Sequence, residues 1–156
     1  GRGDVIAILL ISLLVVPSLR SKKYVSMFAI FGITVPLCNW LLKQFFNAPR
    51  PLKSFPQQHI HTVPWLDNLY AFSFPSGHTL GAFALFLLLS FLLPKNKKEW
   101  SILFLILALS TAYSRLYLGQ HFFLDVYVGS ILGSCISFII FVFITSKFNK
   151  TSVTCT

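Results

Sequence analysis

The run FFLDVYVGSILGSCISFIIFVFIT, residues 122–145, decides the fold class of this chain. Its one charged residue is Asp125, and it exceeds the roughly 20 apolar residues that an α-helix needs to cross a bilayer. It does not alternate between apolar and polar residues, as a strand of a membrane β-barrel would. The run therefore predicts a transmembrane helix.

Four further apolar segments precede it. They cover Val5–Leu19, Tyr24–Phe46, Thr79–Leu93 and Trp100–Tyr113. Hydrophobic residues make up 55% of the 156 residues and charged residues only 11%, too few to cover the surface of a soluble globule. We predict an all-α, polytopic transmembrane bundle with five visible spans, folded as a single domain over residues 1–156.

The positive charges predict how the bundle is oriented. The net charge is +9, and the cations gather between or after apolar segments. The clusters are Arg20, Lys22 and Lys23; then Lys95, Lys97 and Lys98; then Lys147 and Lys150. Loops rich in Lys and Arg face the cytoplasm, so we expect a cytoplasmic C-terminus, with the 47–78 and 114–121 connections on the other side. No basic stripe suited to nucleic acid is visible, so nucleic acid is not expected as a partner.

The 47–78 connection is the long extramembrane stretch. It contains five prolines, which break regular helix, and aromatic residues of the kind found at membrane interfaces. Loops of this length in a compact domain are usually functional. We therefore interpret it as an extracytoplasmic active-site loop.

Neither the cysteines nor the paired histidines indicate a metal site. Cys38 and Cys135 lie in apolar segments and Cys155 in the polar tail, which is no disulfide framework and no zinc spacing. His59 and His61 are expected to be loop or substrate-contacting residues. No metal and no cofactor are expected.

The first set of unexplained polar residues is Lys43 followed, seven positions later, by Arg50-Pro51. Seven residues of helix return to the same face, although Pro49 is expected to end the helix just before Arg50. The alternative is a pair of interfacial cations that extend to lipid headgroups. Both possibilities stay open for this set taken alone.

The second set is Pro75-Ser76-Gly77-His78, immediately before an apolar segment. Ser76 is a plausible N-cap, and the free N–H groups of a helix start favour an anion such as phosphate. Gly77 would let the backbone approach a ligand closely. The alternative is an ordinary serine cap with an incidental histidine.

The third set is Ser114-Arg115, His121 and Asp125. His121 and Asp125 are four residues apart at the start of a helix, so they share a face. A carboxylate there can accept the Nδ1–H of the imidazole and leave Nε2 with an outward lone pair, as a nucleophile requires. The alternative is a buried His–Asp pair that only holds helices together.

Together the three sets supply what phosphoryl transfer needs. Cations neutralise the equatorial oxygens, a nucleophile attacks in line, and an acid protonates the leaving oxygen. This combination predicts phosphoryl chemistry on a substrate at the membrane.

The three sets resemble the signature motifs of the type 2 phosphatidic acid phosphatase superfamily. Those motifs are Lys-x6-Arg-Pro, Pro-Ser-Gly-His and Ser-Arg-x5-His-x3-Asp, and all occur here in order and without substitution between Lys43 and Asp125. The resemblance implies a six-helix core with its site on the extracytoplasmic side. The five segments would be the last five helices, and the usual first helix would lie outside this chain, which opens with Gly1 rather than Met.

The resemblance also implies a role for each motif residue. His121 attacks phosphorus to form a phosphohistidine, Asp125 orients it, and His78 protonates the leaving oxygen and then activates water. The phosphate-binding residues would be Lys43, Arg50, Ser76, Gly77 and Arg115, with Pro51 and Ser114 in support.

The expected activity is that of a metal-independent phosphoric-ester hydrolase acting on a lipid phosphate in a bacterial inner membrane. Polyprenyl diphosphate or lipid A phosphate is the favoured substrate, with phosphatidylglycerol phosphate and phosphatidic acid as alternatives. A phosphotransferase that passes the phosphoryl group to a lipid or sugar acceptor is a second hypothesis. A non-enzymatic lipid-binding or transport protein is a third, and the oligomeric state is left open.

Overall fold

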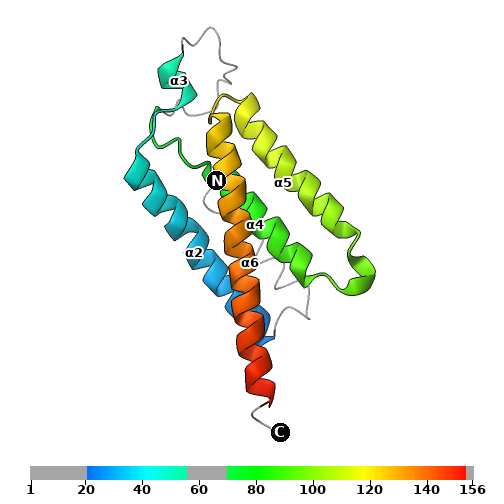
Figure 1. Ribbon diagram of the computed structural model, residues 1–156. Coiled ribbons are helices and arrows are strands. Elements are labelled where there is room, and N and C mark those ends of the chain that lie inside the picture. Colours follow the sequence, from blue (N-terminus) through cyan, green and yellow to red (C-terminus); the bar gives the residue numbers. More distant parts are fainter. Residues whose placement is uncertain (1–20, 56–69, 154–156) are drawn as a thin grey trace.

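The computed structural model describes residues 21–55 and 70–153, and every regular element in these ranges is helical (Figure 1). The elements are α2, Lys22–Phe46; α3, Pro51–Ser54; α4, Gly77–Leu92; η3, Lys95–Lys97; α5, Trp100–Tyr117; and α6, Phe123–Val153. The predicted all-α class is confirmed. The segment Val5–Leu19 lies outside the described residues.

Three stretches in the described ranges are long and apolar enough to cross a membrane, namely Lys22–Ser54, Trp100–Tyr117 and Phe123–Asn149. Helix α4 is apolar but has 16 residues, which span ~24 Å at 1.5 Å per residue. The chain is therefore a multi-pass membrane protein, and the prediction of five spans stays a prediction.

The ends of α2 and α5 both concern the site: α2 ends at Phe46, where its apolar segment was expected to end, whereas α5 continues past the expected Tyr113. Helix α2 ends at Phe46 because Asn47 adopts a left-handed conformation with φ 40° and donates its N–H to the Lys43 carbonyl. The helix therefore stops before Pro49 is reached. Helix α5 continues to Tyr117 and is closed by Gly119, whose φ is 60°.

Helix α4 lies at the centre of the bundle and packs against α2, α5 and α6. The core cluster joins three helices through Met27, Phe28, Phe31 and Val35; Leu80, Ala84, Leu85 and Leu88; and Ile140 and Ile144. Large apolar side chains on the outer faces are exposed, among them Ile102 and Phe143. This outer surface is suited to lipid, because lipid tails solvate apolar side chains as well as a protein core does.

The contact between α4 and α6 is a close approach of two backbones. A Cβ atom at Gly129 would lie 2.9 Å from the Ser76 carbonyl oxygen, and one at Gly133 would overlap the Leu80 carbonyl oxygen. The Ser137 hydroxyl, one turn further on, donates to the Ala84 carbonyl. Small residues at this spacing are typical of helix contacts in membranes, where close packing replaces the hydrophobic effect.

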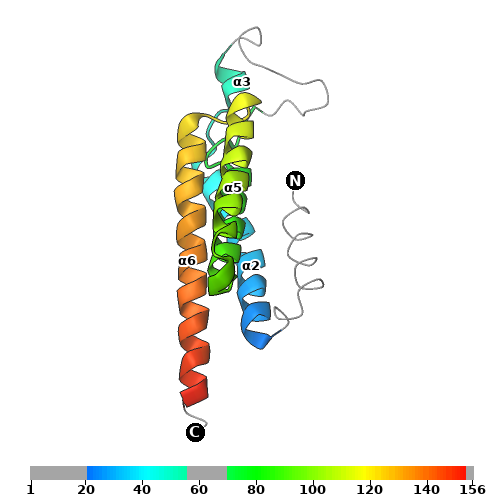
Figure 2. The same cartoon turned by 90° about the vertical axis from the view of Figure 1, so that its right-hand side faces the viewer.

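The connections are sorted between the two ends of the bundle, as Figures 1 and 2 show. One end carries α3, the start of α4 and the α5–α6 connection; the other carries the start of α2, η3 and the last turns of α6. The described members of the three lysine clusters therefore lie at the end opposite the predicted motif residues.

We predict that Gly133→Ala destabilises the protein by about 1–3 kcal/mol, because the added methyl group would push the α6 backbone away from α4. Gly32→Ala is the matched control, since a Cβ at Gly32 meets nothing within 4 Å. Its expected effect is neutral or slightly stabilising, as alanine favours helix. Thermal unfolding in detergent micelles checks both variants, and equal melting temperatures would contradict the close-packing argument.

Candidate active site

The structure brings the three predicted sets to one end of the bundle. Lys43 lies in the last turn of α2, Arg50 before α3 and Arg115 in the last turn of α5. The set Ser76, Gly77 and His78 opens α4, and His121 and Asp125 flank the start of α6. The α5–α6 connection and the 70–76 segment lie beside one another there (Figure 1).

His121 and Asp125 form a buried pair. Their exposed fractions are both 4%, and His121 Nδ1 lies 3.5 Å from Asp125 Oδ2. The same carboxylate oxygen accepts the backbone N–H of Phe122 at 2.9 Å. Asp125 is the acidic residue of the first turn of α6, where the helix dipole favours negative charge. The hydrogen bond from the Phe122 N–H and the position in the first turn of α6 thus hold the Asp125 carboxylate in place.

Ser73 belongs to this site, although no motif indicated it. Its side chain is completely buried, its hydroxyl donates to Asp125 Oδ2, and its Oγ lies 3.4 Å from His121 Nδ1. Its backbone N–H donates to the Ala48 carbonyl at 2.9 Å. The signal in the sequence is weak: one small polar residue in the apolar run AFSFP, residues 71–75.

Arg50 is held inside the protein and does not extend to headgroups. Its exposed fraction is 8%, its Nε donates to the Ala71 carbonyl at 3.0 Å, and one terminal nitrogen donates to both the carbonyl and the side-chain oxygen of Gln120 at 3.1 Å. Its charge also acts on Asp125 and Arg115. Pro51 follows at the first position of α3 and is buried. Burial therefore excludes the headgroup alternative for Arg50, and Gln120 is a further residue that the motifs did not indicate.

Lys43 is anchored by the segment that precedes α4. Its ammonium group donates to the Phe72 carbonyl, and its charge acts on Arg50 and Asp125. Phe72 has a φ of 57°, a conformation that bulky residues rarely adopt and that clusters at functional sites. The Phe72 carbonyl that accepts the Lys43 hydrogen bond thus directly precedes Ser73 in the chain.

Ser76 and Gly77 occupy the predicted helix start but make other contacts than expected. Ser76 is the N-cap of α4, yet its hydroxyl bonds to Thr79 Oγ1 at 2.9 Å and caps no backbone N–H. A Cβ at Gly77 would lie 2.8 Å from the amide atoms of Asn39, so the glycine permits close packing against α2. His78 is exposed in the first turn of α4.

Arg115 and Ser114 interact directly. The Ser114 hydroxyl donates to the Thr111 carbonyl at 2.7 Å and accepts from Arg115 Nε at 3.1 Å. The Arg115 carbonyl accepts the N–H of Gln120 at 3.1 Å, which closes the turn that leads to His121. The Ser114 hydroxyl therefore holds the Nε end of the Arg115 guanidinium group on the last turn of α5.

The surroundings of His121 favour the neutral imidazole. Burial lowers the pKa of His121 below its ordinary value of 6.5, and the positive charges of Arg50 and Lys43 lower it further. The hydrogen bond and the charge of Asp125 act in the opposite direction without reversing the shift. A neutral imidazole keeps a lone pair on one ring nitrogen, which a nucleophile needs.

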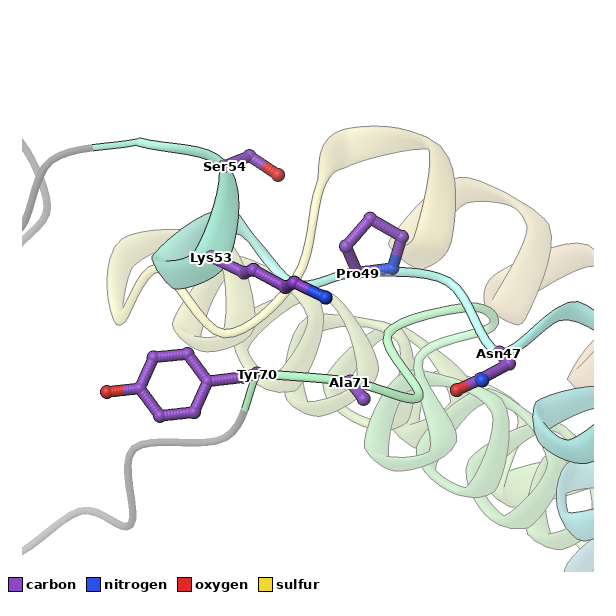
Figure 3. Close-up of a pocket in the computed structure, with 6 residues that line it drawn as sticks. All are labelled: Asn47, Pro49, Lys53, Ser54, Tyr70 and Ala71. Atoms are coloured by element: carbon purple, nitrogen blue, oxygen red, sulfur yellow. The ribbon is translucent and has the colours of Figure 1, made fainter.

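An open cleft of about 350 Å³ lies beside α3 (Figure 3). Its lining is Asn47, Pro49, Lys53, Ser54, Tyr70 and Ala71. The Lys53 side chain extends along the cleft toward Pro49, and the Tyr70 ring points outward (Figure 3). None of the predicted catalytic residues lines it. It adjoins the site through Ala71, whose carbonyl holds Arg50.

In the described ranges no three His, Cys, Asp or Glu side chains come together as a metal site would require. His59 and His61 lie outside the described residues, as does Cys155, whereas Cys38 and Cys135 are free thiols.

The fold and the site define a class of protein: a helical membrane protein with a buried His–Asp pair beside several cations. The profile of the PAP2 superfamily matches residues 21–149 of the chain. The chain belongs to the PAP2 superfamily, which confirms the resemblance of the three motifs.

The alignments with named relatives include most of this chain but a smaller share of each relative. Undecaprenyl-diphosphatase BcrC of Bacillus subtilis is 30% identical over 138 residues, which is 88% of this chain and 66% of that protein. Lipid A 4'-phosphatase of Bacteroides thetaiotaomicron is 34% identical over 101 residues, 62% of this chain and 43% of that protein. The chain thus spans less than two thirds of both.

A solved structure is similar to the fold as well as to the sequence. The crystal structure of a transmembrane PAP2 type phosphatidylglycerolphosphate phosphatase from Bacillus subtilis superimposes with a TM-score of 0.75 and 27% identity. The match covers 92% of this chain and 70% of that one. The helical membrane architecture is therefore shared with a PAP2 phosphatase.

We predict that His121 titrates below pH 6.5, the ordinary value, because burial and two nearby cations disfavour its charged form. Between its lowered pKa and 6.5 the unfolded chain binds the proton more tightly, so the free energy of unfolding rises with pH in that window. Nitrogen NMR of labelled histidine in micelles measures the titration, assigned by the signal lost in His121→Ala. A midpoint above 6.5 would contradict the effect of burial.

Proposed function

We propose that this chain is an integral-membrane lipid phosphatase that hydrolyses a lipid phosphomonoester or diphosphate through a phosphohistidine at His121. The observation that carries the proposal is the buried His121–Asp125 pair beside Arg50 and Lys43 at one end of a membrane bundle. Membership of the PAP2 superfamily and the names of its relatives support the reaction class.

The proposed first step transfers the phosphoryl group to the protein. Nε2 of His121 attacks phosphorus as the bond to the lipid oxygen breaks, and Asp125 accepts the Nδ1–H and stabilises the positive charge that develops on the ring. His78 gives a proton to the departing lipid oxygen. In the second step His78 takes a proton from water, the water oxygen attacks phosphorus, the N–P bond breaks, and phosphate leaves.

The cations bind and stabilise the phosphoryl group in this proposal. Lys43, Arg50 and Arg115 neutralise the equatorial oxygens, with Gly77 at the start of α4 supplying a backbone N–H group. The backbone N–H of Ser76 is already bonded to the Asp125 carbonyl. Arg50 and Lys43 are held by neutral carbonyl oxygens, so their charge is not cancelled by those contacts. Pro51 and Ser114 act in support, through the start of α3 and the hydrogen bond to Arg115.

For the substrate we favour polyprenyl diphosphate or a lipid A phosphate. The support is the similarity to an undecaprenyl-diphosphatase and to a lipid A 4'-phosphatase. Phosphatidylglycerol phosphate is the next candidate, since relatives in sequence and in structure carry that name. The cleft with Lys53 beside Arg50 offers room for a polar headgroup.

We place the protein in a bacterial inner membrane, with the site on the extracytoplasmic side and the C-terminus in the cytoplasm. The support is the position of the lysine clusters at the end of the bundle opposite the site, because lysine-rich ends face the cytoplasm. Hydrolysis is favoured over transfer to a lipid or sugar acceptor by the phosphatase names of the relatives. Release of free phosphate without an added acceptor tests that choice.

We predict that His121→Ala lowers the rate of phosphate release by at least ~10³-fold, because the nucleophile is removed. Release is measured on purified lipid phosphates and diphosphates in detergent, each tested separately. Ser130→Ala is the matched control: this serine is on the helix that follows His121, is partly exposed, and donates its hydroxyl to the Tyr127 carbonyl. Turnover by His121→Ala at the rate of Ser130→Ala would refute the assignment of the nucleophile.

We predict that phosphate release persists in the presence of EDTA, because the imidazole supplies the nucleophile and the cationic side chains supply the positive charge. The measurement compares the purified protein before and after chelation. Loss of activity on chelation that added Mg²⁺ or Zn²⁺ restores would contradict a metal-independent mechanism.

A further inference from the structure

We propose that Ser73 is a positioning residue that fixes the tautomer of His121 by donating its hydroxyl hydrogen bond to Asp125. The proposal rests on the function proposed above, since it concerns how the nucleophile is prepared. Ser73 lies outside the three motifs, and it reaches the pair from the segment between α3 and α4.

The position of Ser73 is fixed from both sides. Its N–H donates to the Ala48 carbonyl in the α2–α3 connection at 2.9 Å, and the carbonyl of the preceding residue, Phe72, holds Lys43. The side chain has no exposed surface. A buried hydroxyl needs a hydrogen-bond partner, and this one has the carboxylate of Asp125.

Counting donors and acceptors gives the direction of each bond. A serine hydroxyl has a single proton, and an ionised carboxylate can only accept, so the proton of Ser73 points to Asp125 Oδ2. Toward His121 Nδ1, 3.4 Å away, Ser73 then presents only lone pairs. Nδ1 therefore faces two acceptors and carries the ring proton, which leaves the lone pair on Nε2.

The distances show why a second acceptor is required. The 3.5 Å between Nδ1 and Asp125 Oδ2 exceeds the roughly 2.7–3.2 Å of a normal N–H···O bond. Asp125 Oδ2 is also shared with the Phe122 N–H. One long contact to a shared oxygen holds an imidazole weakly, whereas two acceptors on the same side form a three-centre bond that fixes both tautomer and ring plane.

Removing the hydroxyl has a predictable electrostatic effect. The charged groups that act on His121 are Asp125, Arg50 and Lys43. Ser73 bonds to Asp125 and so partly satisfies the charge of that carboxylate. Without this bond Asp125 attracts the imidazolium more strongly, so His121 keeps its proton to a higher pH. A residue that only fills space would leave that titration unchanged.

The experiment compares Ser73→Ala, Ser73→Cys and Ser73→Thr in the full chain in detergent. Ser137→Ala is the control, because Ser137 is an equally buried serine whose hydroxyl donates to the Ala84 carbonyl, far along α6 from the site. We expect Ser73→Ala to lower kcat about 10–100-fold, the range of one hydrogen bond to a charged group, with KM changed less than about twofold. The acid limb of kcat/KM should move to higher pH.

The other variants separate positioning from folding. Ser73→Thr keeps the hydroxyl and should recover most of the rate, whereas Ser73→Cys fills similar space with a weak donor and should resemble Ser73→Ala. Ser137→Ala should lower the melting temperature, leave the acid limb in place and change kcat far less than Ser73→Ala does. Should Ser73→Ala fail to fold, Ser73→Cys gives the same test.

Nitrogen NMR of histidine tests the inference without any substrate. The neutral His121 ring should carry its proton on Nδ1 in the wild type and become a mixture of tautomers in Ser73→Ala. An unchanged tautomer together with unchanged kcat and acid limb in Ser73→Ala would overturn the role of Ser73, even if His121→Ala is inactive. Full activity of His121→Ala would instead overturn the proposed function.

Discussion

The contact between α4 and α6 is the constraint on which the site depends. Four residues at intervals of four, Asp125, Gly129, Gly133 and Ser137, form the face of α6 that meets the α4 backbone. At its upper end the Ser76 N–H donates to the Asp125 carbonyl at 2.9 Å. In lipid, helices gain little from burying apolar side chains, so close backbone contact and hydrogen bonds must hold them together. The same contact brings the start of α4, Ser76 to His78, against the His121–Asp125 pair at the start of α6.

The charge balance at this end of the bundle explains why an anion would bind there. The acidic residues in the described ranges are Asp125 and Glu99, and Glu99 precedes α5 at the opposite end. The site end carries Lys43, Arg50, Lys53 and Arg115. Carbonyl and amide oxygens orient Lys43 and Arg50 without neutralising them, and burial strengthens the field of Arg50. Preorganised positive charge of this kind stabilises the transition state of phosphoryl transfer.

Much of the fold and the motif positions could be predicted from the sequence, because both depend on local patterns. Apolar length gave the helices, and a spacing of four placed His121 and Asp125 on one face. The helix ends were less accurate: α5 continues to Tyr117, past the expected Tyr113, and Asn47 rather than Pro49 stops α2. The expected serine cap also differed, since the Ser76 hydroxyl bonds to Thr79. Hydrogen-bond choices among nearby donors are settled by packing, which a linear motif does not contain.

By itself, the sequence determined that the chain crosses a membrane as helices and that it carries three polar motifs of the PAP2 superfamily, because apolar length and short spacings are local properties. Only the tertiary structure decided which other residues reach the site. Ser73 is 48 residues from His121, and Gln120 is 70 residues from Arg50. Neither belongs to a local pattern, and each is brought to its partner by the packing of α4 between its neighbours. The hydrogen bond from the Ser73 hydroxyl to Asp125 was decided in the same way, because the two groups come within reach only when the helices pack together.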